Sequence, residues 1–239
     1  MENERNAQAA AQPAEEKKPV EEKKPGYPMH KRKYTPLYTI IVFLYGLLVK
    51  LLFFMKIEGR ENVPKDRNCI LMGNHQCLLD PVTLALCVPD REIHFMGKKE
   101  LFENKALGWV FRQVHGFPVD RGNMDMGAIR TAMGVLKAGE TLGIFPEGTR
   151  NKTDDLMLPF KEGSFKMAEK TGCAIVPMAI TGSADILENH FPKVKATHVI
   201  LEYGKPIYPN ELDKETKKKI GAHCQGVIEE MLVKNEKLR

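Results

Sequence analysis

"CILMGNHQCLLDPVTLALCV", residues 69–88, contains a short apolar run followed by a longer one that begins at Pro81. The first run is rich in large aliphatic residues and ends at Gly73, which is typical of a buried strand. Proline at the start of the second run is typical of the first turn of a helix. The stretch therefore predicts a strand, a turn and a helix, with His75 and Asp80 in or beside the turn.

The same alternation continues from residue 57 to the end of the chain. Short runs rich in Ile, Val and Phe predict strands at 69–73, 92–97, 115–119, 141–146, 174–180 and 197–203. Runs with apolar residues at helical spacing predict helices at about 81–88, 104–113, 124–138, 161–171 and 211–236. We expect residues 57–239 to form one α/β domain with a mixed central sheet flanked by helices.

The N-terminal part of the chain has a different composition. Residues 1–33 are polar and contain "EEKKP" twice, which predicts a disordered tail. Residues 34–56 are expected to form a membrane-associated helical segment, because "LYTIIVFLYGLLVKLLFFM" at 37–55 has Lys50 as its only charge. As a helix this run is roughly 28 Å long, enough to span a bilayer, but basic residues at both ends favour insertion into one leaflet.

Charge and cysteine usage narrow the class of partner. The net charge is only +5, and basic and aromatic residues do not interleave, so nucleic acid is not an expected partner. An anionic lipid surface and a phosphorylated substrate fit this charge equally well. The five cysteines are scattered and the seven histidines form no H-x-x-x-H group. We therefore expect reduced thiols, a cytoplasm-facing active site and no metal.

His75 and Asp80 suggest a catalytic pair. On a continuous helix they would point roughly 140° apart, but a turn before Pro81 can bring them together. A carboxylate bonded to one imidazole nitrogen leaves the other free to accept a proton from a substrate hydroxyl. Each residue also has a structural explanation, Asp80 as the N-cap of the helix and His75 as a hydrogen-bonded residue at a strand end. Cys77, between them, is either a nucleophile or a small buried residue.

Basic residues follow further predicted strands. Arg121 comes after the strand at 115–119, and Lys98 and Lys99 follow the strand at 92–97. The strand at 141–146 leads into four residues that suit a phosphate and a hydroxyl: Glu147, Gly148, Thr149 and Arg150. Surface salt bridges, a plain turn and solvated lysines are the alternative interpretations. Combined with the His–Asp pair, the basic residues suggest an anionic substrate that presents a hydroxyl.

Four blocks in order, "NHQCLLD", "GFPVDRG", "FPEGTR" and "IVPMAI", resemble the motifs of the glycerolipid acyltransferase family. The resemblance covers about residues 57–210. It implies His75 as general base and Asp80 as its orienting partner. It also implies that the glycerol phosphate is held by Arg121 and by four residues of the third block, Glu147, Gly148, Thr149 and Arg150. Lys98 would assist them.

The resemblance further implies a reaction. A fatty acyl group would pass from an acyl-coenzyme A or acyl carrier protein thioester to the hydroxyl of lysophosphatidate, giving phosphatidate at a phospholipid membrane. No metal or redox cofactor is expected, because a thioester is already activated. The alternatives are another acceptor, such as glycerol 3-phosphate or a different lysophospholipid, a Cys77-dependent thioester hydrolase, and a non-catalytic lipid-phosphate binding protein.

Overall fold

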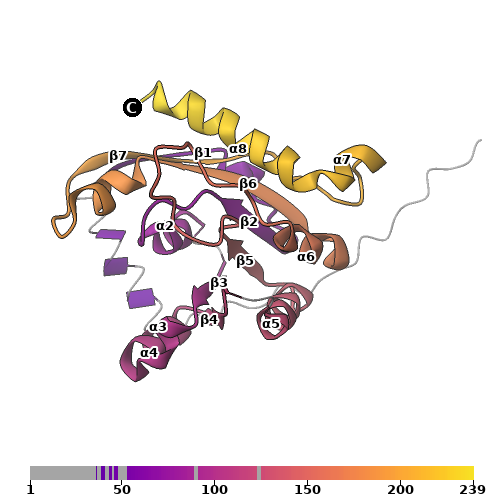
Figure 1. Ribbon diagram of the computed structural model, residues 1–239, viewed down its shortest axis with the longest axis horizontal. Coiled ribbons are helices and arrows are strands. Elements are labelled where there is room, and N and C mark those ends of the chain that lie inside the picture. The colour runs from indigo at the N-terminus through magenta and orange to yellow at the C-terminus, as the bar shows by residue number, and fades with distance from the viewer. Residues whose placement is uncertain are drawn as a thin grey trace, which may run out of the picture.

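The computed structural model describes residues 53–88, 91–122 and 125–239, together with isolated helical positions between 36 and 47. Its central sheet (Figure 1) is built from β1 (Phe53–Glu58), β2 (Cys69–Gly73), β3 (Ile93–Lys98), β4 (Gly116–Val119), β5 (Thr141–Ile144), β6 (Ala174–Thr181) and β7 (Thr197–Tyr203). The lateral order is β1-β7-β6-β2-β5-β3-β4. The β6–β7 pair is antiparallel and the other neighbouring pairs are parallel, so the predicted mixed sheet is confirmed.

Helices cover both faces of this sheet. They are α2 (Asp80–Cys87), α3 (Glu100–Glu103), α4 (Lys105–Gln113), α5 (Met126–Lys137), α6 (Gly163–Thr171), α7 (Lys214–Lys218) and α8 (Ile220–Glu236). Short 3-10 turns are η1 (Arg60–Asn62), η2 (Ser183–Ile186) and η3 (Glu188–His190). The helix predicted at 211–236 is two helices, because Lys219 leaves the helical conformation with φ −117° and ψ 29°.

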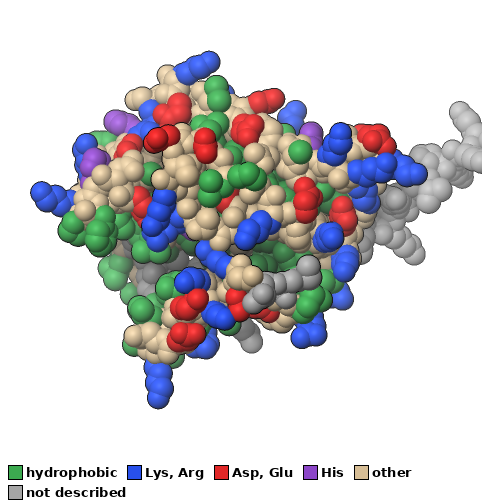
Figure 2. Space-filling view, viewed as in Figure 1, with side chains coloured by type: hydrophobic (Ala, Val, Ile, Leu, Met, Phe, Trp, Pro, Cys, Tyr) green, Lys and Arg blue, Asp and Glu red, His purple; other side chains and the backbone are tan. Residues whose placement is uncertain are grey.

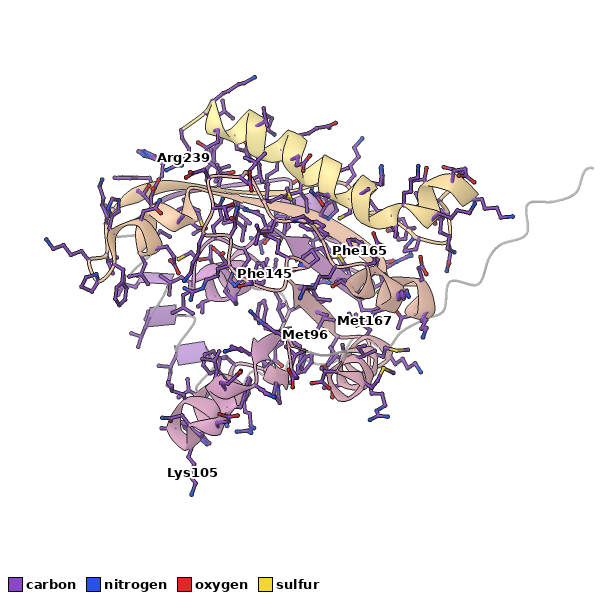
Figure 3. All side chains as sticks on the ribbon, viewed as in Figure 1. Met96, Lys105, Phe145, Phe165, Met167 and Arg239 are labelled. Carbon is purple, nitrogen blue, oxygen red and sulfur yellow. The ribbon has the colours of Figure 1, made fainter. Side chains whose placement is uncertain are left out.

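The central strands β2, β5 and β6 are buried on both faces, and their apolar residues alternate between two clusters. In β2, Ile70 and Met72 pack with the inner faces of α5, α6 and α8, where the buried Phe165 and Met167 lie (Figure 3). Leu71 of the same strand belongs to the opposite cluster, together with Leu84 of α2. The core therefore consists of two apolar layers with the sheet between them.

The first strand corrects part of the predicted N-terminal segment. Residues 53–56, expected at the end of a membrane helix, begin β1, which pairs in parallel with β7 from Phe53↔Thr197 to Glu58↔Glu202. Met55 contributes to the second apolar cluster, so this strand belongs to the α/β domain. Across the residues the structure describes, no helix combines the length and apolarity needed to cross a bilayer. The predicted tail at 1–33 and most of 34–52 lie outside those residues.

Four neighbouring strands bring the sequence blocks together. β2, β5, β3 and β4 are adjacent and parallel, so their carboxyl ends meet at one edge of the sheet. Lys98 is the last residue of β3, and His75, Glu147 and Arg121 come shortly after β2, β5 and β4. In parallel α/β sheets this edge is where ligands bind.

Candidate active site

Asn74 holds the end of β2 against β6. Its side-chain amide donates to the carbonyl oxygen of Ile180 at 2.9 Å, and its Oδ1 accepts from the Ile180 amide at 2.8 Å. The buried side chain thus replaces one step of the backbone ladder between the two strands. Because the side chain continues the pairing, the backbone is free to turn out of the sheet and present His75.

His75 and Asp80 form a buried pair, as the turn before α2 predicted. Nδ1 of His75 and Oδ2 of Asp80 are 2.9 Å apart, and His75 and Asp80 are 7% and 0% exposed, respectively. The same Oδ2 accepts from the backbone amides of Gln76 and Cys77, each at 2.8 Å. The prediction that Asp80 caps its own helix is wrong, because its carboxylate points back into the preceding turn. The amides fix the carboxylate, and the carboxylate fixes the imidazole.

The segment after β5 holds His75 from the other side. The ring of Phe145, central in Figure 3, stacks on the imidazole with ring centroids 4.3 Å apart. Oε1 of Glu147 accepts from the His75 amide at 2.6 Å, and the Asn151 amide donates to the His75 carbonyl at 2.6 Å. Residues 145–151 therefore hold the ring, the amide and the carbonyl of His75.

Glu147 therefore has a role that the sequence did not predict. Its second oxygen, Oε2, accepts from the Leu158 amide at 2.8 Å, so both oxygens bind backbone N–H groups. Glu147 is 3% exposed, and burial raises the pKa of its carboxyl group despite these bonds. Both carboxylate oxygens accept from backbone amides, so we expect Glu147 to position His75, and its contact with substrate stays a prediction.

Cys77 is buried, and its thiol lies against the carboxylate of Glu188. Burial raises the pKa of its thiol, and a hydrogen bond with Glu188 raises it further. The structure therefore keeps Cys77 protonated, which opposes the nucleophile interpretation because the thiolate is the reactive form. Glu188 of η3 also accepts from the Leu78 amide at 2.9 Å, and so ties η3 to the turn between His75 and Asp80.

The predicted phosphate-binding cations differ in their surroundings. Arg150 is half-buried and bonded to Glu188 through one guanidinium nitrogen. Removal from water, and next the charge of Arg150, lower the pKa of Arg121. Lys98 is largely exposed and lies 3.2 Å from Glu100, whereas Lys99 is paired with Asp120.

Gly148 and Thr149 form the outer part of the third block. Gly148 has φ +74°, which favours glycine, and a Cβ there would lie 2.8 Å from Nζ of Lys161. The Lys161 ammonium thus lies directly over the turn, and among the described residues it has no recorded hydrogen bond or ion pair. Lys161 is exposed. Thr149 is exposed beside it.

This arrangement suits proton abstraction next to a bound anion. Because Asp80 bonds Nδ1 of His75, the proton is assigned there and Nε2 is the basic nitrogen. Within the described part of the chain, no protein group is recorded on Nε2. Arg150 is tied to the His75–Asp80 turn through Glu188, and Lys161 lies over Gly148 in the segment that holds His75. The site therefore offers positive charge to an anionic molecule whose hydroxyl reaches Nε2.

Comparison with known proteins assigns the class. The model of the acyltransferase family matches residues 54–181, which is more than half of the chain. The chain therefore belongs to the acyltransferase family and is an enzyme of acyl transfer, as the four blocks predicted. This membership removes the non-catalytic alternative.

Similar proteins within the family carry a more specific name. The 1-acyl-sn-glycerol-3-phosphate acyltransferase of Bacillus subtilis is 36% identical over 154 residues, covering 64% of this chain and 74% of that protein. The enzyme of the same name from Streptococcus pneumoniae is 31% identical over 178 residues, covering 72% of this chain but only 64% of the relative, less than two thirds of its length.

A solved structure is also similar. The crystal structure of the 1-acyl-sn-glycerophosphate (LPA) acyltransferase PlsC from Thermotoga maritima has a TM-score of 0.69 and 27% sequence identity with this chain. The match covers 82% of this chain and 79% of that one. The solved structure therefore supports the α/β fold over most of this chain.

Proposed function

We propose that this enzyme transfers a fatty acyl group from an acyl thioester to the free hydroxyl of lysophosphatidate, giving phosphatidate for phospholipid synthesis. The observation that carries the proposal is the buried His75–Asp80 pair, with Nε2 directed away from the carboxylate. The names of the similar proteins support the acceptor. Acyl-coenzyme A and acyl carrier protein thioesters are the two proposed donors.

The His–Asp pair supplies the base. Nε2 of His75 takes the proton of the acceptor hydroxyl while the hydroxyl oxygen attacks the thioester carbonyl carbon. The tetrahedral intermediate then collapses, the carbon–sulfur bond breaks, and the leaving thiolate takes the proton from Nε2. Oδ2 of Asp80 stabilises the imidazolium that forms between these steps. General base catalysis of this kind contributes about 10² to 10⁴ in rate.

The cations bind the phosphate of the acceptor. Arg121 and Arg150 can each offer paired N–H donors to phosphate oxygens, while Lys98 and Lys161 act as point charges. Arg150 keeps one nitrogen on Glu188, so the ion pair fixes the guanidinium without using all of its donors. Gly148 leaves room over the turn for the Lys161 ammonium, which can bind the phosphate, and Thr149 can donate its hydroxyl. Glu147 supports the site by fixing His75.

The lipid nature of the acceptor and product gives the N-terminal segment its role. We propose that residues 34–52 associate with the membrane, that the α/β domain begins at β1, and that the active site faces the cytoplasm. The runner-up functions use another acceptor, either glycerol 3-phosphate or a different lysophospholipid.

The test is an acceptor-by-donor matrix on the full-length protein purified in detergent. Lysophosphatidate should be the preferred acceptor, and His75→Ala should lower kcat about 10² to 10⁴-fold while the protein stays folded. Cys77→Ser is the matched control, because the direct-transfer mechanism leaves it active. Full activity of His75→Ala would contradict the mechanism, and preference for glycerol 3-phosphate would establish the runner-up.

A further inference from the structure

Large apolar side chains are exposed on three segments around the active-site edge. Leu78 lies in the turn between His75 and Asp80, α4 follows β3, and a loop at 191–196 follows η3. Trp109 of α4 is 56% exposed and Phe191 of the loop is 77% exposed. We call the exposed apolar residues of these segments the apolar rim: Leu78, Leu107, Trp109, Val110, Phe191 and Val194. Exposed large apolar side chains gathered on one side of a protein mark a candidate interaction site.

The loop is a fixed projection with a structural tie to the site. The Lys195 amide donates to the carbonyl of the buried Ile186 at 3.0 Å, and the Lys193 amide donates to the His190 carbonyl at 2.9 Å. Residues 191–196 are all exposed. At the start of the loop, Glu188 holds Leu78 and Arg150. The loop therefore presents Phe191 and Val194 to the exterior while its base contacts the catalytic turn.

The exposed loop at 191–196 carries two lysines and no acidic residue. Lys193 and Lys195 flank Val194 on the exposed segment. A hollow of about 540 Å³ at the base of the loop is lined by the basic residues His190, Lys195, His198 and Arg239. Asp185, which also lines it, is ion-paired with Arg239. Exposed apolar side chains next to exposed lysines suit a phospholipid leaflet, in which anionic headgroups cover an apolar interior.

The same side of the molecule carries the other exposed apolar residues near the N-terminus. In Figure 1 the loop between β6 and β7 projects at the left, α4 lies at the lower left, and the described helical positions between 36 and 47 lie between them. Ile40, Phe43, Leu44 and Leu47 are exposed there. Figure 2 shows hydrophobic side chains on this left edge with lysine, arginine and histidine beside them. Lys105, at the start of α4, extends away from the body of the protein (Figure 3).

We propose that the apolar rim, with Lys193 and Lys195, is a membrane-contact surface of the α/β domain that binds a bilayer containing anionic phospholipids. Phe191 and Trp109 enter the interfacial region, and the lysines contact the headgroups. This contact is additional to the N-terminal segment. It orients the carboxyl ends of the parallel strands toward the bilayer, so a lipid acceptor reaches His75 without crossing open solvent.

Tryptophan fluorescence tests the contact directly, because Trp109 is the only tryptophan of the chain. Full-length protein is mixed with vesicles of phosphatidylcholine and phosphatidylglycerol. Emission from Trp109 should shift to shorter wavelength, and so should emission from Phe191→Trp in a Trp109→Phe background. The matched control is Val233→Trp in the same background, since Val233 is 48% exposed on α8. No shift at either rim position, or an equal shift at Val233→Trp, overturns the proposal.

A charge-reversal experiment tests the preference for anionic lipid. Lys193→Glu combined with Lys195→Glu should weaken binding to phosphatidylglycerol-containing vesicles about tenfold or more, because each lysine near such a surface contributes on the order of 1 kcal/mol. Lys217→Glu with Lys218→Glu on α7 is the control and should bind normally. Unchanged binding of the loop variant overturns the proposal. No acyl transfer is measured, so a failed result leaves the proposed reaction unaffected.

Discussion

Replacing Glu147 by glutamine separates a positioning role from a substrate-binding role. The carboxylate is 3% exposed and accepts from the His75 amide at 2.6 Å and the Leu158 amide at 2.8 Å. Glutamine keeps one acceptor oxygen, but its NH₂ group must face the other backbone N–H. A hydrogen bond to a charged group is worth about 1.5–3 kcal/mol, and an unsatisfied buried donor costs about 1–3 kcal/mol. Both effects concern the same backbone N–H group and do not add in full, so we expect Glu147→Gln to lower the free energy of unfolding by about 3 kcal/mol.

Two measurements check this expectation. At about 2–4 °C per kcal/mol for a chain of this size, thermal unfolding monitored by circular dichroism should show Tm lower by roughly 6–12 °C. Because the His75 backbone loses its support, kcat should fall up to about 10²-fold. Glu230→Gln, at an exposed position on α8, should change neither quantity. A higher KM for lysophosphatidate with unchanged Tm and kcat would refute the reasoning and restore Glu147 as a substrate contact.

Three further predictions follow from the contacts around the site. Lys161→Ala should raise the KM for lysophosphatidate about tenfold with little change in Tm, whereas Lys161→Arg should keep most of the affinity; equal KM values in steady-state assays would remove Lys161 from the phosphate site. Cys77→Ser should retain most of kcat because the buried Cys77 stays a thiol, and a trapped acyl-cysteine in mass spectrometry would argue otherwise. Burial lowers the pKa of His94, so the unfolded chain binds a proton at a higher pH than the folded protein does. The free energy of unfolding should therefore fall as pH drops below about 6.5, and His94→Gln should reduce this dependence on pH in urea titrations.

Strands and helices of the α/β domain were predictable where a segment carries its own pattern. The six predicted strands are found within one or two residues of their predicted ends, since each is a short run rich in apolar residues. β1 was missed because "FFM" continues the apolar N-terminal run, and hydropathy alone cannot separate the two. Only pairing with β7, far along the chain, makes residues 53–58 a strand.

The candidate site shows the same limit at the level of single residues. The His75–Asp80 pair was predictable, because the proline after Asp80 creates the turn that joins them. The bonds of Glu147 to two backbone amides were not predictable, because sequence does not show which amides will lie near a carboxylate. Lys161 was missed because its approach to Gly148 depends on where α6 packs after the third block. Local pattern therefore predicted the chemistry, and long-range packing decided which residues support it.

The contacts of residues 145–151 with His75 have a consequence for engineering and divergence in this family. The base and its supports lie on separate stretches of sequence, yet they form one mechanical unit, because the ring, the amide and the carbonyl of His75 are each held by the third block. Substitutions at the two stretches should be strongly non-additive. A chimera that exchanges only one stretch with a distant relative inherits mismatched partners. The two blocks must be transplanted, and are expected to change, as a matched pair.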